Sequence, residues 1–251
     1  MHEVAKNVFC VRGTDVNWLL VREGRDLTLI DSGWLGDVPA LERSIRAIGC
    51  RPGDVCAVLL THAHLDHVGG LNHLRERYGV PVHMDPREVP HARREYLEQV
   101  RPAALLQRAW RPRVLAWSLR ILRAGATRDL AIPHAEPFPH DGPLDLPGRP
   151  VPVACHGHTS GHSAYYLPDA GVVATGDALV TGHPTSPVVG PQLLPCYFSH
   201  SARDSVAALD SLAELDAGVL VPGHGDPWYG PLSSAVAEAR RRAASSEGTR
   251  R

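Results

Sequence analysis

The segment VLLTHAHLDHVGG, residues 58 to 70, limits what this chain can fold into more than any other part of the sequence. Three histidines and an aspartate, His62, His64, Asp66 and His67, occupy six positions directly after an apolar run. His62 and His64 project to the same side of an extended segment, because strand side chains alternate with a period of two. Asp66 and His67 follow at the expected start of a helix, where outward-pointing backbone NH groups let the chain fold back toward one point. Imidazole and carboxylate ligands together suit zinc, and also iron or manganese.

A purely structural interpretation makes the four residues loop and capping groups, with Asp66 as a helix N-cap. That interpretation fits a single histidine among the fifteen of the chain. It does not fit the spacing His-x-His-x-Asp-His at the end of a strand, which places four ligands side by side. We therefore predict a metal site where the strand becomes a helix.

The rest of the chain alternates short apolar runs with amphipathic stretches. Runs with strand-like content predict strands at residues 7–11, 16–23, 26–30, 55–60, 151–155, 163–167, 171–175 and 218–221. The first three lie so close together that we expect sequential antiparallel strands. Apolar residues at helical spacing predict helices near residues 37–49, 67–79, 201–215 and 233–243. Strands grouped with flanking helices in each half predict two β-sheets packed face to face with helices outside.

Composition and charge restrict the class of protein further. The 251 residues are 43% hydrophobic and carry a formal net charge of -1, which suits one soluble globular domain with a sizeable core. This balance predicts no nucleic-acid partner. The N-terminal segment MHEVAKNVFCVRG lacks the basic start and apolar stretch of a signal peptide, and no apolar run approaches the roughly 18 residues of a membrane span. We expect a cytoplasmic protein without stable membrane insertion.

Residues 58 to 70 resemble the signature of the metallo-β-lactamase superfamily, and motifs similar to its other parts follow in order. LIDSG places Asp31 where the family has a strand-terminal aspartate that orients the metal loop. GHTSGH supplies His158, TGD supplies Asp177 and VPGHG supplies His224. Each piece alone is a weak signal, but their order and their positions at strand ends are jointly specific.

The resemblance runs from Val8 to about Pro227 and implies a fold of the α/β (α+β) class. That fold is an αββα sandwich of two packed mixed β-sheets with helices on the outer faces. We predict a single domain over residues 1–235 with a helical, arginine-rich insert at about 86–132. A terminal helix and a disordered tail are expected over 236–251, with the tail at SSEGTRR.

The resemblance also implies a dinuclear centre with two divalent metal ions, most simply Zn²⁺, with Fe or Mn as alternatives. One ion takes His62, His64 and His158, the other takes Asp66, His67 and His224, and Asp177 bridges them. A metal-bridging hydroxide is then the nucleophile, because bound zinc brings the pKa of water to about 7. Asp66 and Asp177 are the expected catalytic residues, with Asp66 orienting the hydroxide.

Other polar residues near the motifs are candidates for supporting the metal ligands or contacting substrate. His156 stands where the family commonly has proline, which could place an extra imidazole at the rim of the pocket. His162 is expected to brace its loop rather than bind metal. Thr181 and His183 lie in a Pro- and Gly-rich loop after Asp177, and loops at the edge of a site often touch substrate.

The family resemblance implies hydrolysis of an ester, lactone, thioester or related acyl bond of a small molecule. Lactonases that act on acyl-homoserine lactones carry a tyrosine three residues after the bridging aspartate, where this chain has Val180. Hydrolysis of β-lactams is one alternative, and an iron-dependent redox enzyme resembling persulfide dioxygenases is another. A non-catalytic binding scaffold is a further alternative, although the complete ligand set argues against it. The sequence leaves the oligomeric state open.

The insert has a composition of its own. Residues 86–128 hold ten arginines against three glutamates, without aspartate or lysine, in a chain that is nearly neutral as a whole. Three hypotheses fit: a surface helical pair that completes the core, a basic helix on an anionic membrane surface, or a lid over the metal site. In the lid hypothesis, apolar residues such as Trp117 line an acyl-sized pocket and the arginines attract an anionic group.

Overall fold

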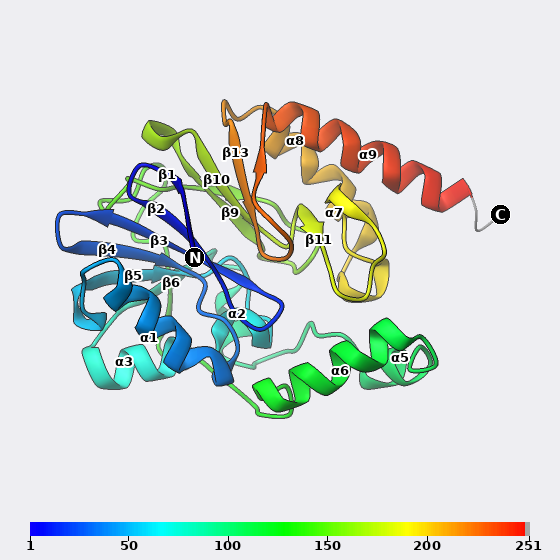
Figure 1. Ribbon diagram of the computed structural model, residues 1–251, viewed down its shortest axis with the longest axis horizontal. Helices are drawn as coiled ribbons and strands as arrows, with labels where there is room; N and C mark the ends of the chain where they lie inside the picture. Colours follow the sequence, from blue (N-terminus) through cyan, green and yellow to red (C-terminus); the bar gives the residue numbers. More distant parts are fainter. Residues whose placement is uncertain (249–251) are drawn as a thin grey trace.

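The computed structural model describes residues 1–248, and the first half of the chain forms a seven-stranded sheet (Figure 1). Its strands lie in chain order: β1 (His2–Ala5), β2 (Val8–Arg12), β3 (Asn17–Glu23), β4 (Asp26–Ile30), β5 (Val55–Leu59), β6 (Val82–Met84) and β7 (Ala135–Pro137). β1 to β4 pair antiparallel, which confirms the predicted antiparallel run, and β4 to β7 pair parallel.

The second half forms a five-stranded sheet in the order β14-β13-β10-β9-β8. Its strands are β8 (Val151–Ala154), β9 (Ser163–Leu167), β10 (Val172–Gly176), β13 (Val219–Pro222) and β14 (Trp228–Tyr229). Only β10 and β13 pair parallel in this sheet, so both sheets are mixed. A separate hairpin joins β11 (Val180–Gly182) to β12 (Val189–Gln192).

Alternating side chains place the two sheets face to face. Leu19 and Val21 of β3 share one buried cluster with Val172 and Ala174 of β10, whereas Leu20 belongs to the cluster on the opposite face. This is the period of two expected of strands that are covered on both faces. The buried interface between the sheets is therefore one layer of the core.

Helices cover both outer faces and complete the predicted αββα sandwich (Figure 1). α1 (Val38–Ala47) and α3 (Leu71–Tyr78) pack on the first sheet. α8 (Leu209–Ala213) and α9 (Leu232–Gly248) pack on the second. The shorter helices of the sandwich are α2 (Leu65–Val68) and α7 (Ala202–Ala207), with 3-10 turns at Leu35–Asp37, Pro52–Asp54, Pro168–Ala170 and Cys196–Phe198.

The C-terminal helix is longer than the stretch of residues 233–243 that predicted it. α9 begins at Leu232, one residue before that stretch and before the boundary expected at residue 236, and it continues to Gly248. The predicted disordered tail starts at Ser245, so its first four residues are helical in the structure. The remaining residues of that prediction, 249–251, lie outside the described part of the chain. Among the described residues, no helix is long and apolar enough to cross a membrane.

The insert leaves the sandwich after β6 and returns to it at β7. It contains α4 (Val89–Ala92), α5 (Pro102–Leu106) and α6 (Pro112–Ala124). Figure 1 shows α5 and α6 on the opposite side of the molecule from α9. Trp117 and Ile121 of α6 are buried against Val16 and Trp34, which belong to loops of the first sheet. The insert is thus attached to the sandwich by an apolar contact of its longest helix.

Candidate metal centre

The seven predicted ligands meet at one edge of the sandwich because each follows or precedes a strand. His62 and His64 leave the end of β5, and Asp66 and His67 lie in α2 immediately afterwards. The other three are His158 between β8 and β9, Asp177 after β10 and His224 after β13. β10 and β13 run parallel, so their carboxyl ends emerge side by side, and the NH of Gly223 donates to the carbonyl of Gly176 at 2.8 Å.

The ligand atoms form two groups, within each of which all atoms lie within 4.8 Å of one another. One group is His62, His64, His158 and Asp177, and the other is Asp66, His67 and His224. Six of the seven side chains are buried, and Asp66 is partly exposed. The structure therefore brings together all seven residues that the motifs single out.

Asp177 lies between the two groups. Its Oδ2 is 3.4 Å from Nε2 of His158 and 3.2 Å from Nε2 of His224. Its Oδ1 is 3.6 Å from Nε2 of His67. The close approach requires glycine at position 223, where an added Cβ would lie 2.2 Å from Asp177 Oδ1. One carboxylate thus faces ligand atoms of both groups.

Hydrogen bonds on the outer side of the rings fix which nitrogen faces the centre. Nδ1 of His67 donates to Asp31 Oδ2 at 2.8 Å, and Nδ1 of His224 donates to the carbonyl of Asp15 at 2.5 Å. His64 is reversed, since its Nε2 donates to the carbonyl of Glu98 at 2.6 Å and its Nδ1 faces Nε2 of His158. Such partners orient metal-binding imidazoles and make the inner nitrogen a better donor to a metal.

Asp31 holds the loop as well as the ring of His67. Its carboxylate accepts hydrogen bonds from the backbone NH and the hydroxyl of Thr61, both at 2.8 Å. Asp31 itself has a left-handed backbone with φ of 61°, which is strained for a residue that is not glycine. The strain persists because the carboxylate is tied to both Thr61 and His67.

Unpaired polar atoms at the centre fit a cation. Among residues 1–248, His62 Nε2, His67 Nε2 and Asp177 Oδ1 are buried without a hydrogen-bond partner. Buried polar atoms normally have a hydrogen-bond partner, so three such atoms without one at the same place indicate a site for a bound ligand. Imidazole nitrogen and carboxylate oxygen are the donors that zinc, iron and manganese accept. The residues therefore fit divalent metal ions.

Protonation differs between the two groups. Burial holds the pKa of His62 and His158 well below the ordinary value and lowers that of His64 to about 4, so these rings are neutral and able to bind metal. Burial also disfavours the charged form of His67, but the carboxylates of Asp31, Asp66 and Asp177 outweigh it and raise its pKa to about 10. The second group therefore holds a proton that a metal ion would displace.

Three of the remaining predicted site residues support the loops instead of lining the cavity. His162 accepts a hydrogen bond from the backbone NH of Asp177 at 3.0 Å, the bracing role expected of it. The hydroxyl of Thr181 donates to the carbonyl of Asp226 at 2.5 Å, beside the His224 loop. His156 lies away from the ligands and pairs with Asp85 at 3.0 Å. Neither Thr181 nor His156 lines the cavity over the ligands, and contact of these two residues with substrate stays a prediction.

Sequence reasoning missed the residues that connect the insert to the ligands. Glu88 is fully buried and accepts hydrogen bonds from the NH of Ala63 at 2.7 Å, from Nδ1 of His91 at 2.7 Å and from the hydroxyl of Thr159 at 2.8 Å. Nε2 of His91 then accepts from the NH of Glu98, whose carbonyl holds His64. Only the i, i+3 spacing of Glu88 and His91 could have signalled this network.

Asn17 is a second residue without a sequence signal. Its side-chain NH₂ donates to the carbonyls of Pro222 and Gly225, at 2.9 and 2.8 Å. These two carbonyls flank His224 in the chain. Asn17 therefore closes the loop that carries the last ligand, from a strand of the other sheet.

A cavity of about 480 Å³ opens over the metal ligands. Its lining includes His64, Asp66, His158, Asp177 and His224 at one end and residues of α5 and α6 at the other. His183 and Trp117 line it, as predicted for substrate contacts, with ring centroids 5.3 Å apart. Val180, at the position of the lactonase tyrosine, is buried in β11 and does not line it. The insert therefore covers the ligands from one side.

The arginines of the insert do not line this cavity. Arg120 pairs with Asp15, Arg113 donates to the carbonyl of Ser186 and Arg108 lies over the ring of Tyr197. None of the arginines lines the cavity, and the attraction of an anionic group by their charge stays a prediction. α6 has features of two of the hypotheses for the insert. One face completes the core, as in the helical-pair hypothesis, and another faces the cavity, as in the lid hypothesis.

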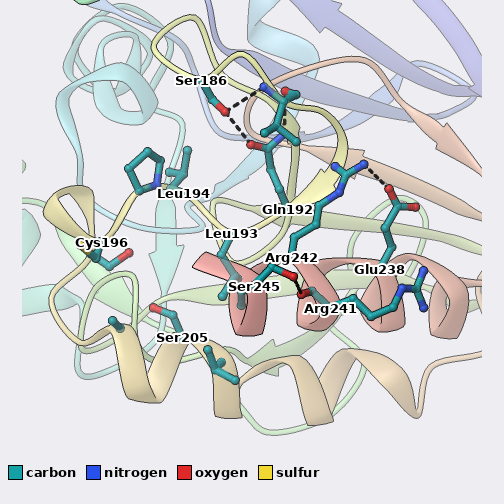
Figure 2. A pocket seen from close by; sticks show the side chains of 16 residues that line it. Ser186, Gln192, Leu193, Leu194, Cys196, Ser205, Glu238, Arg241, Arg242 and Ser245 are labelled. Atoms are coloured by element: carbon teal, nitrogen blue, oxygen red, sulfur yellow. Dashed lines mark hydrogen bonds and ion pairs between the residues drawn. The ribbon is translucent and has the colours of Figure 1, made fainter. Parts of the chain in front are cut away.

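A second and larger cavity, of about 890 Å³, lies between α7, α9 and the segment that follows β12 (Figure 2). Arg242 forms an ion pair with Glu238 on one side of it, and Ser186 donates to Gln192 on another. None of the seven ligand candidates lines it, so the metal chemistry belongs to the smaller cavity. Leu194 lines both cavities and forms part of the wall between them.

Comparison with known proteins assigns the family. The model of the metallo-beta-lactamase superfamily matches residues 11–224, which include all seven ligand candidates. This chain belongs to that superfamily. The ligand groups described above accordingly make it a member with the metal-binding residues present.

Relatives are named as metallo-hydrolases. A probable metallo-hydrolase of Bacillus subtilis (strain 168), YflN, is 27% identical over 217 residues, covering 84% of this chain and 80% of the relative. A hydroxyacylglutathione hydrolase of Rhodobacter capsulatus is 26% identical over 165 residues, covering 61% of this chain and 45% of that enzyme.

Solved structures agree on the fold. A metallo-beta-lactamase family protein of Thermus thermophilus superposes with a TM-score of 0.67 at 25% identity, over 97% of this chain and 81% of that one. A metallo-beta-lactamase of Cronobacter sakazakii reaches 0.69 at 18% identity, over 99% and 94%. The latter likeness concerns the fold alone.

Proposed function

We propose that this chain is a dinuclear metal-dependent hydrolase that cleaves an ester, lactone or thioester bond of a small molecule. The observation that carries the proposal is the position of Asp177, whose two oxygens face both ligand groups at the floor of an apolar cavity. A carboxylate shared between two cations is the arrangement of two-metal hydrolases. The relationship to a hydroxyacylglutathione hydrolase supports a thioester among the possible substrates.

In the proposed centre, His62, His64 and His158 would hold one ion, Asp66, His67 and His224 would hold the other, and Asp177 would contribute to both. When bound, the ions activate water near neutral pH and stabilise the negative charge that develops on the acyl oxygen. We propose zinc, for which this donor set is suited.

The chain's own groups then have distinct roles in the proposal. Asp66 lines the cavity and its side chain is 15% exposed, so its carboxylate can accept a hydrogen bond from the attacking water and hold its proton. Asp31, Asp15 and Glu98 keep three imidazoles in place. In the proposal, an acyl group that packs against the apolar wall displaces water from it, which strengthens the electrostatic interactions at the cavity floor.

The test is metal analysis of the purified native protein, followed by hydrolysis assays on lactones, thioesters, aryl esters and β-lactams. The proposal expects two equivalents of metal and turnover of at least one acyl class that chelation removes and zinc restores. A single iron with consumption of oxygen would favour the persulfide dioxygenase-like alternative and contradict the proposal. The proposed partner is a small-molecule substrate, with neither nucleic acid nor inserted membrane.

A further inference from the structure

The cavity over the metal ligands has a polar floor and an apolar wall. The floor consists of ligand side chains, including Asp66 and Asp177. The wall comes from the insert: Pro102, Leu105, Leu106, Ala109, Leu115, Leu119 and Leu122 are among its residues. A volume of about 480 Å³ lies within the range of small-molecule sites, roughly 300–1,000 Å³.

Several leucines of the wall are exposed to a degree that is costly for apolar side chains. Leu115 and Leu119 are each 48% exposed, Leu122 is 51% exposed and Leu106 is 75% exposed. Contiguous exposed apolar surface marks binding sites in monomeric proteins. These leucines border the same cavity as the ligands, so an acyl group held at the floor would extend over them.

Charge selects among the possible occupants. No arginine or lysine of the described chain lines this cavity, and its only ionisable acids are the two metal-binding candidates. An anionic end group placed among the leucines would lose its hydration and meet no cation there. An uncharged hydrocarbon meets no such penalty and gains from burial.

We propose that the insert selects substrates with an uncharged, apolar acyl chain, which lies against α5 and α6 while the acyl carbon sits at the metal ligands. This rests on the proposed hydrolase function and names its substrate class. Because burial of the acyl group supplies the binding energy, substrates with longer acyl groups bind more tightly until the cavity is filled.

The experiment compares 4-nitrophenyl acetate, 4-nitrophenyl octanoate and the ester whose octanoyl chain ends in a carboxylate. We expect kcat/KM of the native enzyme to rise at least about tenfold from acetyl to octanoyl and to fall at least about tenfold when the terminal carboxylate is added. Ala109→Trp fills the cavity and should remove the octanoyl advantage. Ala103→Trp, on the exposed side of α5 and outside the lining, is the matched control and should keep it.

A second readout does not depend on turnover. Titration with the neutral dye N-phenyl-1-naphthylamine should show binding to the native protein and to Ala103→Trp, and at least about tenfold weaker binding to Ala109→Trp. Equal kcat/KM along the series, or equal losses in the two variants, would overturn the inference. If no ester is cleaved at all, the proposed function fails, and the dye titration alone then decides whether the cavity binds apolar groups.

A separate observation concerns His183, which lies between the metal ligands and the apolar wall. Its ring centroid is 4.9 Å from that of His224, 5.0 Å from Phe198 and 5.3 Å from Trp117. Nδ1 of His183 accepts a hydrogen bond from the backbone NH of Thr185 at 3.3 Å and lies 2.7 Å from the Thr185 hydroxyl. A backbone NH can only donate, so Nδ1 is an acceptor and the ring proton is on Nε2.

We infer that His183 is a catalytic residue that donates a hydrogen bond from Nε2 to the acyl oxygen as its negative charge develops. The inference rests on the proposed function, because it needs an acyl group at the cavity floor. A donor placed in advance lowers the barrier without a change in substrate binding. His183 lines the cavity beside the ligand candidate His224, and the inference places the acyl oxygen on this side of the cavity floor.

His183→Phe removes the donor and keeps a ring, and His183→Gln keeps an NH donor. We expect kcat to fall roughly 10²–10³-fold in the Phe variant, with KM changed less than about threefold, and to recover in part in the Gln variant. Metal content should be unchanged, and ¹⁵N NMR of the imidazole should show the Nε2–H tautomer. Full kcat in His183→Phe, or an Nδ1–H tautomer, would overturn this inference alone. A native enzyme without acyl hydrolysis would contradict the proposed function as well.

Discussion

The seven ligand candidates lie on loops and the short helix α2 that follow or precede buried strands, whereas the insert reaches the same cavity mainly from the helices α5 and α6. Each ligand loop is held by hydrogen bonds to other parts of the sandwich, such as Asn17 beside His224 and Asp31 beside His67. In the insert, half-exposed leucines line open space. In the proposed function this difference separates two tasks: the strand ends position the metal ligands, and the insert shapes the space for substrate.

The network of Glu88, His91 and Glu98 joins these two regions. It begins at α4 of the insert and ends on Nε2 of His64. A substitution in the insert can therefore alter the position of the ligand candidate His64 through three hydrogen bonds. The following predictions test how far the two regions are independent.

The largest effect is expected at the shared carboxylate. Asp177→Ala removes the one side chain that faces both ligand groups, so both ions should bind weakly and kcat/KM should fall at least about 10³-fold. Metal analysis and steady-state kinetics on the same preparation measure the two quantities. Near-native turnover together with two equivalents of metal would show that the assignment of ligands is wrong.

The next effect separates two histidines of one loop. His158→Ala should lose one equivalent of metal and most activity, because His158 belongs to the first ligand group. His162→Ala should keep both equivalents, because His162 contacts the backbone of Asp177 and lies outside both groups. Metal stoichiometry after dialysis is the measurement. Equal loss of metal in the two variants would contradict the choice of ligand within GHTSGH.

A smaller effect on stability is expected where the insert meets the centre. Glu88→Ala leaves His91, Thr159 and the NH of Ala63 buried without their acceptor, which should lower the free energy of unfolding by about 3–5 kcal/mol in urea denaturation. The metal affinity of the group that contains His64 should fall roughly 10–100-fold, since His91 holds Glu98 and the Glu98 carbonyl orients His64. Glu95→Ala, an exposed acid of the same insert, is the control and should change neither.

The same carboxyl gives a pH dependence with a definite sign. Burial raises the pKa of Glu88, but hydrogen bonds from His91, Ala63 and Thr159 outweigh it and hold the pKa below the ordinary value of 4.5. A lowered pKa in the folded state stabilises the protein above pH 4.5, and this contribution is lost as the pH falls through the folded value. The difference in unfolding free energy between native protein and Glu88→Gln should therefore shrink below pH 4.5. A difference that grows on acidification would contradict this sign.

The smallest effect is expected at the wall of the cavity. Leu122→Ala should raise KM for an octanoyl ester by up to about tenfold and that for an acetyl ester by less, because Leu122 is half-exposed and lines the cavity. Leu97→Ala, an exposed leucine of the insert outside this cavity, is the matched control. Trp117 is a poorer probe, since it is buried in a core cluster and its truncation would cost stability as well. Equal changes for the two esters would leave the insert as structure only.

Local spacing predicted that His62, His64, Asp66 and His67 come together, because these residues are neighbours in the chain. The long apolar runs likewise predicted the central strands, because the residues that mark such a strand are consecutive in the sequence. Strands of three residues, such as Val82–Met84 and Ala135–Pro137, were missed because their pairing partners, rather than their own composition, define them.

Tertiary contacts determine the roles of residues that their spacing in the sequence does not predict. Glu88 meets Thr159 and Gly161, 71 and 73 positions away, so the only local pattern that marks it is its i, i+3 spacing from His91. α6 is apolar on more than one face, and its sequence does not tell that Val114 is buried while Leu115 and Leu119 stay half-exposed at the cavity. The direction of the arginines was likewise set by partners such as Asp15 and Ser186.

The central claim is that two metal ions share Asp177 in a hydrolytic centre. The most direct measurement is the metal content of the native protein per chain, taken with the activity of the same sample before and after chelation. Two equivalents of zinc, with acyl hydrolysis that chelation abolishes and added zinc restores, is the result we predict. One equivalent of iron with oxygen uptake, or hydrolysis that persists in the metal-free protein, would contradict the account.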